Sequence, residues 1–154
     1  MHWRIGMRIS VKARYALAAT ISMAQEYESG EYIKIINLSE KLNISKIYLE
    51  QVFSLLKHAD VVISTKGRQG GYRLMKEPSA TTAFDILNAV ETSLFEKTAE
   101  TVSEKARGIE TAMSTVVFGK LDASIKDFLS SITLVDLVSE ADKHIGDENY
   151  MFYI

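Results

Sequence analysis

The sequence predicts a mainly α-helical fold that contains one small β-hairpin and one long helix. Three observations support this: apolar residues recur at helical spacing, two β-rich runs flank a single glycine-rich turn, and one apolar stripe continues from residue 103 to residue 130. The chain has 154 residues, 47% of them hydrophobic and 25% charged. This composition suits one globular unit with a core of its own.

Two helices are expected in the first third of the chain. The first, over residues 8–28, carries its apolar side chains at Val11, Tyr15, Ala18, Ile21 and Met23 or Ala24. Residues 32–35 are expected to be extended, and a second, short helix follows them. Its apolar side is formed by Ile36, Leu38 and Leu42.

A tight turn and a third helix are expected next. Asn43 tolerates the left-handed conformation and Ser45 can cap a helix, so residues 42–45 are predicted to form the turn. The third helix covers residues 45–59 and buries Leu49, Val52, Phe53 and Leu56. Its other side is polar and consists of Lys46, Glu50, Gln51, Ser54 and Lys57.

A β-hairpin is predicted immediately after this helix. Residues 61–65 and 72–75 are rich in strand-forming side chains, and they flank a turn that contains Lys66 and Arg68. The glycines of this turn do not form a nucleotide-binding loop, because such a loop precedes a helix, whereas a second strand follows here. Helix, turn, helix and basic hairpin together predict a winged helix-turn-helix that binds double-stranded DNA. The alternative is a winged helix that serves only as a protein-interaction scaffold.

The second half of the chain is predicted to hold a dimerisation helix. A helix over residues 82–91 and a connector over residues 92–104, with little apolar content, precede it. The long helix needs a partner for its apolar stripe, and we expect the dimer interface to consist of Ile109, Met113, Val116, Val117, Leu121, Ile125 and Phe128. A short helix opens at residues 132–138.

Four regions follow from these elements. They are a winged helix-turn-helix DNA-binding region (1–80), a connecting helix and loop (81–102), the dimerisation helix with the short last helix (103–145), and a tail (146–154). Residues 1–80 carry 12 Lys and Arg against 7 Asp and Glu, whereas residues 81–154 carry 6 against 13. A basic first half can approach phosphates. The alternative is that solvated charge is simply distributed unevenly.

Several functional classes are excluded. The chain has no cysteine, which excludes disulfides, thiolate metal sites and a cysteine nucleophile. His2, His58 and His144 are far apart, so no metal site or other cofactor is expected, and the lack of a catalytic motif argues against an enzyme. No apolar run approaches the roughly 20 residues that span a bilayer, so we expect a cytoplasmic protein without a membrane partner.

Four segments resemble the Rrf-type bacterial winged-helix regulators. They are residues 7–16, the Y-L-E-Q-V-F run at 48–53, the G-G-Y-R-L run at 70–74, and residues 132–137. Members of this family are dimeric transcription regulators, often built around an iron–sulfur cluster held by three cysteines in the segment that matches residues 92–110. No cysteine is present here. Within this family, the sequence resembles a cysteine-free branch, the CymR-type repressors of cysteine metabolism.

The resemblance implies a homodimeric repressor of cysteine and sulfur-metabolism genes that is controlled by complex formation with cysteine synthase (O-acetylserine thiol-lyase). The tail at residues 150–154 is similar to the end of those proteins, and Tyr153 and Ile154 are expected to dock on the enzyme. Alternatively, the tail aromatics pack on the dimer. Two other functions remain open: a regulator of another pathway with a direct small-molecule effector, and an interaction module that does not bind DNA.

The expected DNA contacts are of two kinds. Glu50 and Gln51 are expected to read base edges, because Glu accepts from cytosine N4 and Gln pairs with adenine. The other contacts, to the DNA backbone or the minor groove, are expected from Arg8, Lys12, Arg14, Ser45, Lys46, Tyr48, Lys66 and Arg68.

Overall fold

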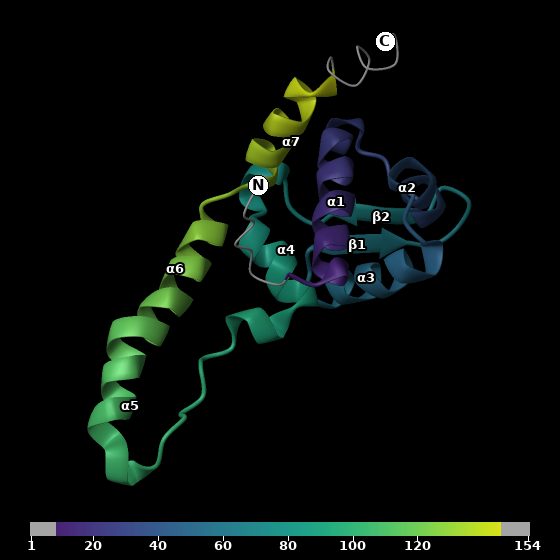
Figure 1. Ribbon diagram of the computed structural model, residues 1–154. Helices are drawn as coiled ribbons and strands as arrows, with labels where there is room; N and C mark the ends of the chain where they lie inside the picture. The colour runs from purple at the N-terminus through teal and green to yellow at the C-terminus, as the bar shows by residue number, and fades with distance from the viewer. Residues whose placement is uncertain (1–8, 146–154) are drawn as a thin grey trace, which may run out of the picture.

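The computed structural model describes residues 9–145, which form a winged unit and a long helical arm (Figure 1). The winged unit contains α1 (Val11–Gln25), α2 (Ile35–Leu42), α3 (Lys46–His58), β1 (Val62–Thr65), β2 (Gly71–Leu74), α4 (Ala83–Val90) and α7 (Leu134–Lys143). The arm consists of α5 (Arg107–Met113), a π-helical turn (Ser114–Phe118) and α6 (Gly119–Ser130). The predicted mainly helical fold with one hairpin is confirmed. Arg8, Tyr153 and Ile154 lie outside the described residues.

One hydrophobic core joins the elements of the winged unit. Phe53 of α3 is fully buried, and its ring lies 4.8 Å from the ring of Tyr72 on β2. The same core includes Ile86 of α4 and Leu134 of α7, both fully buried. Burying each such side chain stabilises the fold by about 1.5–3 kcal/mol. The helices before and after the arm are therefore both anchored on the unit that contains α3.

The predicted apolar face of α1 is partly confirmed: Met23 and Ala24 are buried and Tyr15 and Ile21 pack against the core, whereas Val11 is 41% exposed. The prediction missed the fully buried small residues of the helix, which are Ala13, Ala16, Ala19 and Thr20. Because α1 lies among α3, α4 and α7, small side chains let these helices approach closely. The Thr20 hydroxyl donates to the Ala16 carbonyl at 2.8 Å, which satisfies a polar group inside the core.

The helix α2 and the turn after it position α3. The helix begins at Ile35, so its inward side chains are Ile35, Leu38 and Leu42, whereas Ile36 is 41% exposed and was wrongly placed in the apolar face. The predicted turn is confirmed: Asn43 has a left-handed φ of 53°, and the Ser45 side chain accepts from the backbone N–H of Tyr48.

The hairpin is joined to the chain before α2. β1 and β2 are antiparallel, and their paired residues run from Val62 with Leu74 to Thr65 with Gly71. Ile33, which precedes α2, forms an isolated antiparallel β-bridge with Tyr72 of β2. The backbones of Ile33 and Tyr72 exchange two hydrogen bonds of 2.8 Å. Gly71, at φ 151°, permits this approach, because a Cβ there would collide with the Ile33 carbonyl.

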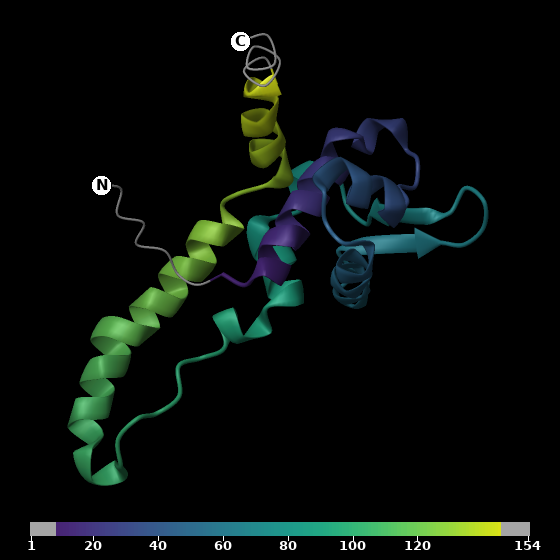
Figure 2. The same ribbon diagram turned by 45° about the vertical axis from the view of Figure 1, so that its right-hand side comes forward.

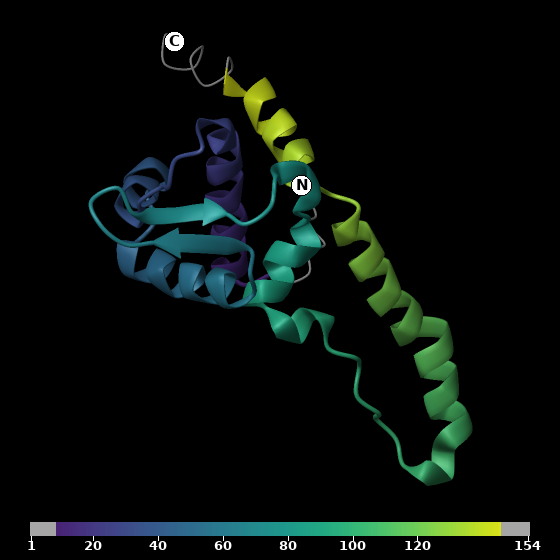
Figure 3. The same ribbon diagram turned by 180° about the vertical axis from the view of Figure 1, so that it is seen from behind.

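The arm extends away from the winged unit, as Figure 3 shows from behind. The long helix does not begin at residue 103: a 3-10 turn (Glu104–Ala106) precedes α5, and the π turn interrupts the regular helix. The connector is also more structured than expected. Thr92–Phe95 forms a 3-10 helix whose Phe95 ring meets Phe84 of α4 at 4.8 Å, and Glu110 of α5 accepts from two connector N–H groups at 3.0 Å.

Within residues 9–145, no helix is long and apolar enough to span a bilayer.

Candidate nucleic-acid interface

The helix α3 has one buried and one solvent-facing side. Leu49, Val52, Phe53 and Leu56 are fully buried, as predicted. The polar residues expected on the other side are all exposed: Lys46, Glu50, Gln51, Ser54 and Lys57. Because the buried side fixes the rotation of α3 about its axis, the polar side is presented outward as one rigid surface.

Glu50 and Lys46 interact across one turn of this outward surface. The Lys46 ammonium lies 3.8 Å from the Glu50 carboxylate, and the two side chains are 56% and 52% exposed. Such an exposed i,i+4 pair is worth about 0.3–0.5 kcal/mol, so either group can exchange its partner for a ligand at little cost.

Ser45 and Tyr48 define the N-terminal end of α3. Ser45 Oγ accepts from Tyr48 N at 3.4 Å, which caps the helix and leaves the hydroxyl hydrogen able to donate elsewhere. The half-buried Tyr48 ring packs edge-on against Tyr15 of α1 at 5.2 Å. This contact brings the first turns of α1 beside the first turn of α3.

The basic residues of α1 therefore lie near the start of α3. Arg14, directly before Tyr15, is exposed, and Lys12 is half-buried. Ser10 caps α1 by accepting from the Ala13 N–H at 3.1 Å, and its own N–H donates to the Glu91 carboxylate at 3.2 Å. The cap and the Glu91 contact fix the end of α1 that carries the two cations.

The tip of the hairpin carries the other predicted cations. Lys66 and Arg68 are both exposed there, and Figure 2 shows the tip projecting from the winged unit on the side opposite the arm. Gly67 adopts φ 102°, and a Cβ on Gly70 would lie 2.5 Å from the Thr65 carbonyl oxygen. The glycines thus serve a tight turn between two strands, and the turn presents two positive charges away from the acidic half of the chain.

One exposed residue of α3 was missed in the sequence analysis. Ile47 is 70% exposed, although it is a large apolar residue in the first turn of the helix. Its spacing of three and four residues from Glu50 and Gln51 was the available signal, because residues at these separations share a helix face.

The predicted dimer interface lies along the arm. Five of its side chains are 51–65% exposed: Ile109, Val116, Val117, Leu121 and Phe128. The other two, Met113 and Ile125, are half-buried. None of the described residues of α5, the π turn or α6 is buried. A single copy of the described chain therefore leaves the stripe open to solvent.

The π turn affects the alignment of this stripe. Residues 109, 113, 117, 121 and 125 follow one another at intervals of four, and each interval drifts by about 40° around a regular α-helix. The turn contains a wider loop, closed by the Gly119 N–H donating to the Ser114 carbonyl five residues earlier. Because a wider turn rotates less per residue, it reduces the drift of these side chains around the arm.

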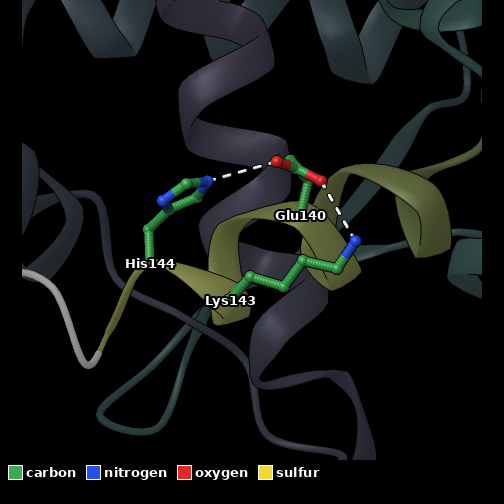
Figure 4. Close-up of polar contacts among 3 residues, drawn as sticks. All are labelled: Glu140, Lys143 and His144. Carbon is green, nitrogen blue, oxygen red and sulfur yellow. Dashed lines mark hydrogen bonds and ion pairs between the residues drawn. The ribbon is translucent and has the colours of Figure 1, made fainter.

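A separate polar cluster lies at the end of α7. Figure 4 shows Glu140 between two partners: His144 Nε2 donates to it at 3.1 Å and Lys143 Nζ at 3.4 Å. These hydrogen bonds, that from His144 first, hold the pKa of Glu140 below its ordinary value. All three side chains are exposed, and they lie on α7, not on α3 or the hairpin.

Residues 9–140 match the Rrf2 family, which is described as a family of iron-dependent transcriptional regulators. The HTH-type transcriptional regulator CymR of Bacillus subtilis (strain 168) is 34% identical over 148 residues, which cover 96% of this chain and 100% of that protein. The HTH-type transcriptional regulator IscR of Erwinia tasmaniensis is 35% identical over 133 residues, or 86% of this chain and 79% of that protein.

A solved structure supports the same relationship. CymR (YrzC), the global cysteine regulator of B. subtilis, superposes with a TM-score of 0.72 at 31% identity, covering 88% of this chain and 98% of the other. These matches confirm the resemblance that residues 48–53 and 70–74 indicated. Both named relatives are transcriptional regulators.

The residues of this chain do not fit a cysteine-held iron cluster. The sequence contains no cysteine, and within residues 9–145 no three His, Asp or Glu side chains are grouped to hold a metal ion. The thiolate donors that an iron–sulfur cluster requires are therefore missing.

Proposed function

Because the chain belongs to the Rrf2 family of transcriptional regulators, we propose that it acts as a homodimeric repressor that binds specific sites on double-stranded DNA. The observation that carries this proposal is the outward side of α3, which is polar, rigidly oriented and flanked by cations of α1. A basic hairpin tip accompanies it. Winged helix-turn-helix proteins use such a helix in the major groove.

In this arrangement α3 reads the bases. Glu50 accepts from the N4 amino group of cytosine, and Gln51 pairs with N6 and N7 of adenine. Lys46, which is paired with Glu50 in the free protein, offsets the repulsion between this carboxylate and the phosphates. Base contacts of this type supply sequence preference.

The remaining residues hold the DNA backbone. Contacts to phosphates or to the minor groove come from Arg8, Lys12, Arg14, Ser45, Lys46, Tyr48, Lys66 and Arg68. The exposure of Arg14, Lys66 and Arg68 supports this role, because a solvated cation can release phosphate counterions on binding without losing an internal partner. These contacts set affinity and register, not sequence preference.

A second copy of the chain covers the arm stripe. An exposed apolar stripe of this length is unfavourable in water, and an identical stripe related by a two-fold axis is complementary to it. Two winged units then meet two half-sites about 34 Å apart, one turn of DNA. In this proposal the DNA-binding role belongs to residues 1–80 and the dimerisation role to the arm within residues 103–145, whereas α4 of the connecting region and α7 pack on the winged unit.

The regulated genes are proposed to be those of cysteine and sulfur metabolism. Two observations support this: the similarity extends over the full length of a Bacillus relative known as a global cysteine regulator, and the chain has no cysteine with which to hold a cluster. In this proposal cysteine synthase (O-acetylserine thiol-lyase) is the controlling partner, and Tyr153 and Ile154 provide the docking residues.

Selection from a randomised pool of DNA duplexes tests the central proposal. The purified chain is expected to enrich one inverted-repeat sequence, and its affinity for that duplex should fall steeply as salt rises. An interaction module that does not bind DNA would enrich no sequence and show no salt dependence. That result would overturn the proposed function.

A further inference from the structure

Among residues 9–145, Ile47 is the most exposed large apolar side chain, at 70%. The other large apolar residues above 50% exposure are Ile145 and members of the arm stripe, where neighbouring apolar side chains offer a shared surface. Ile47 is instead surrounded by the polar residues of α3. A single exposed apolar residue is normal on a protein surface, so exposure alone does not indicate a function. The position of Ile47 on α3 does.

The position of Ile47 is central to the outward side of α3. It precedes Glu50 by three residues, Gln51 by four and Ser54 by seven, which is the spacing of one helix face. This face lies opposite the buried one that includes Val52 and Phe53. Ile47 also occupies the first turn of α3, and it is the N-terminal residues of a recognition helix that contact base edges.

The chemistry of the major groove limits what such a side chain can recognise. Ile47 has no hydrogen-bonding group, and the one apolar group on the major-groove edges of the four bases is the C5 methyl of thymine. Cytosine in its place would present its N4 amino group to an apolar side chain, which leaves a donor without a partner. The match in chemistry is therefore between Ile47 and a thymine methyl.

We infer that Ile47 is a specificity-determining residue that selects thymine by packing against its C5 methyl group. This inference rests on the proposed function and extends it to one base pair of each half-site. That base pair lies next to those contacted by Glu50 and Gln51, because the three side chains project from adjacent turns of one helix face. Ile47 thus adds an apolar contact to a readout that is otherwise made of hydrogen bonds.

The test removes the methyl group alone. Each thymine of the selected half-site is replaced, one at a time, by deoxyuridine, which differs from thymidine only by the missing C5 methyl. At one position, this replacement is expected to weaken binding of the unmodified protein about fourfold, the loss that corresponds to one buried methyl group. An Ile47→Ser variant is expected to bind the thymine and deoxyuridine duplexes equally at that position.

The matched control is Ile36→Ser, at an exposed isoleucine of α2, which should retain the fourfold difference. The inference is overturned if no deoxyuridine position weakens the unmodified protein, or if Ile47→Ser retains the difference. Either result leaves the proposed function standing, because the protein still selects a sequence. Failure to select any sequence would instead count against the proposed function itself.

Discussion

Lys46 and Glu50 lie one turn apart on α3, with the ammonium nitrogen 3.8 Å from a carboxylate oxygen. Both side chains are more than half exposed, so their attraction contributes little to folding stability. The pair places an acceptor for a base and a cation for a phosphate side by side on the outward surface. The pair therefore matters for recognition, and Gln51 follows it directly on the same surface.

Replacing Gln51 with Ala should weaken binding to the selected duplex by about 1–3 kcal/mol, since a bidentate contact to adenine is lost. Binding to a duplex of random sequence should change little, because base contacts contribute mainly at the specific site. Fluorescence anisotropy on both duplexes measures the two effects. Equal losses on both would show that Gln51 does not discriminate between bases.

Lys66→Ala and Arg68→Ala should weaken binding to specific and random duplexes alike. Each variant removes one phosphate contact, so the slope of log affinity against log salt should fall in magnitude by about 0.9. Lys120→Ala, an exposed lysine on the arm, is the matched control and should leave the slope unchanged. An unaltered slope in both hairpin variants would remove the hairpin tip from the DNA interface.

Val117→Glu and Leu121→Glu should each convert the dimer to a monomer. Both residues are 51% exposed in one chain, and their burial between two copies would leave a carboxylate without a partner. Light scattering measures the mass, and affinity for the inverted repeat should fall sharply because two half-sites are no longer bound together. Lys120→Glu adds the same side chain at a polar position of α6 and should remain dimeric. A stable dimer in both stripe variants would contradict the assignment.

Removing Tyr153 and Ile154 should abolish binding of cysteine synthase while leaving dimerisation and DNA binding intact. The physical reason is that an aromatic and an aliphatic side chain provide most of the apolar contact of a short docking peptide. Calorimetry with the purified enzyme measures the loss, and Glu148→Gln is the control that keeps both docking residues. If the shortened chain loses its dimer, the two side chains pack within the regulator; undiminished enzyme binding would place the docking site elsewhere.

Gly71→Ala should destabilise the fold by about 1–3 kcal/mol or more, because an L side chain at φ 151° is strained and its Cβ meets the Ile33 backbone. Thermal unfolding followed by circular dichroism measures the change. Gly108→Ala is the control: nothing lies within 4 Å of its Cβ position, and alanine favours the helical state of α5. Equal unfolding midpoints for the two variants would show that the Ile33–Tyr72 bridge does not constrain this position.

The elements whose signals are local could be predicted from the sequence. The periodicity of Leu49, Val52, Phe53 and Leu56 predicted both the extent of α3 and its outward side. Asn43, Ser45 and the glycines of the hairpin predicted turns because their backbone and capping preferences act over a few residues. Most of the candidate interface could be predicted from the sequence for this reason, since it consists of one amphipathic helix and one hairpin.

Features that depend on neighbours distant in sequence became known only from the packing of the folded chain. The inward face of α1 includes the small residues Ala13, Ala16 and Ala19 because three helices approach it closely, whereas hydropathy favours larger residues such as Val11, which is exposed. The contact of Phe95 with Phe84 depends on how the connector packs against α4. The spacing of Ile47 from Glu50 and Gln51 indicated which face it shares, but only the packing of α3 showed that no other element covers this isoleucine, which is 70% exposed.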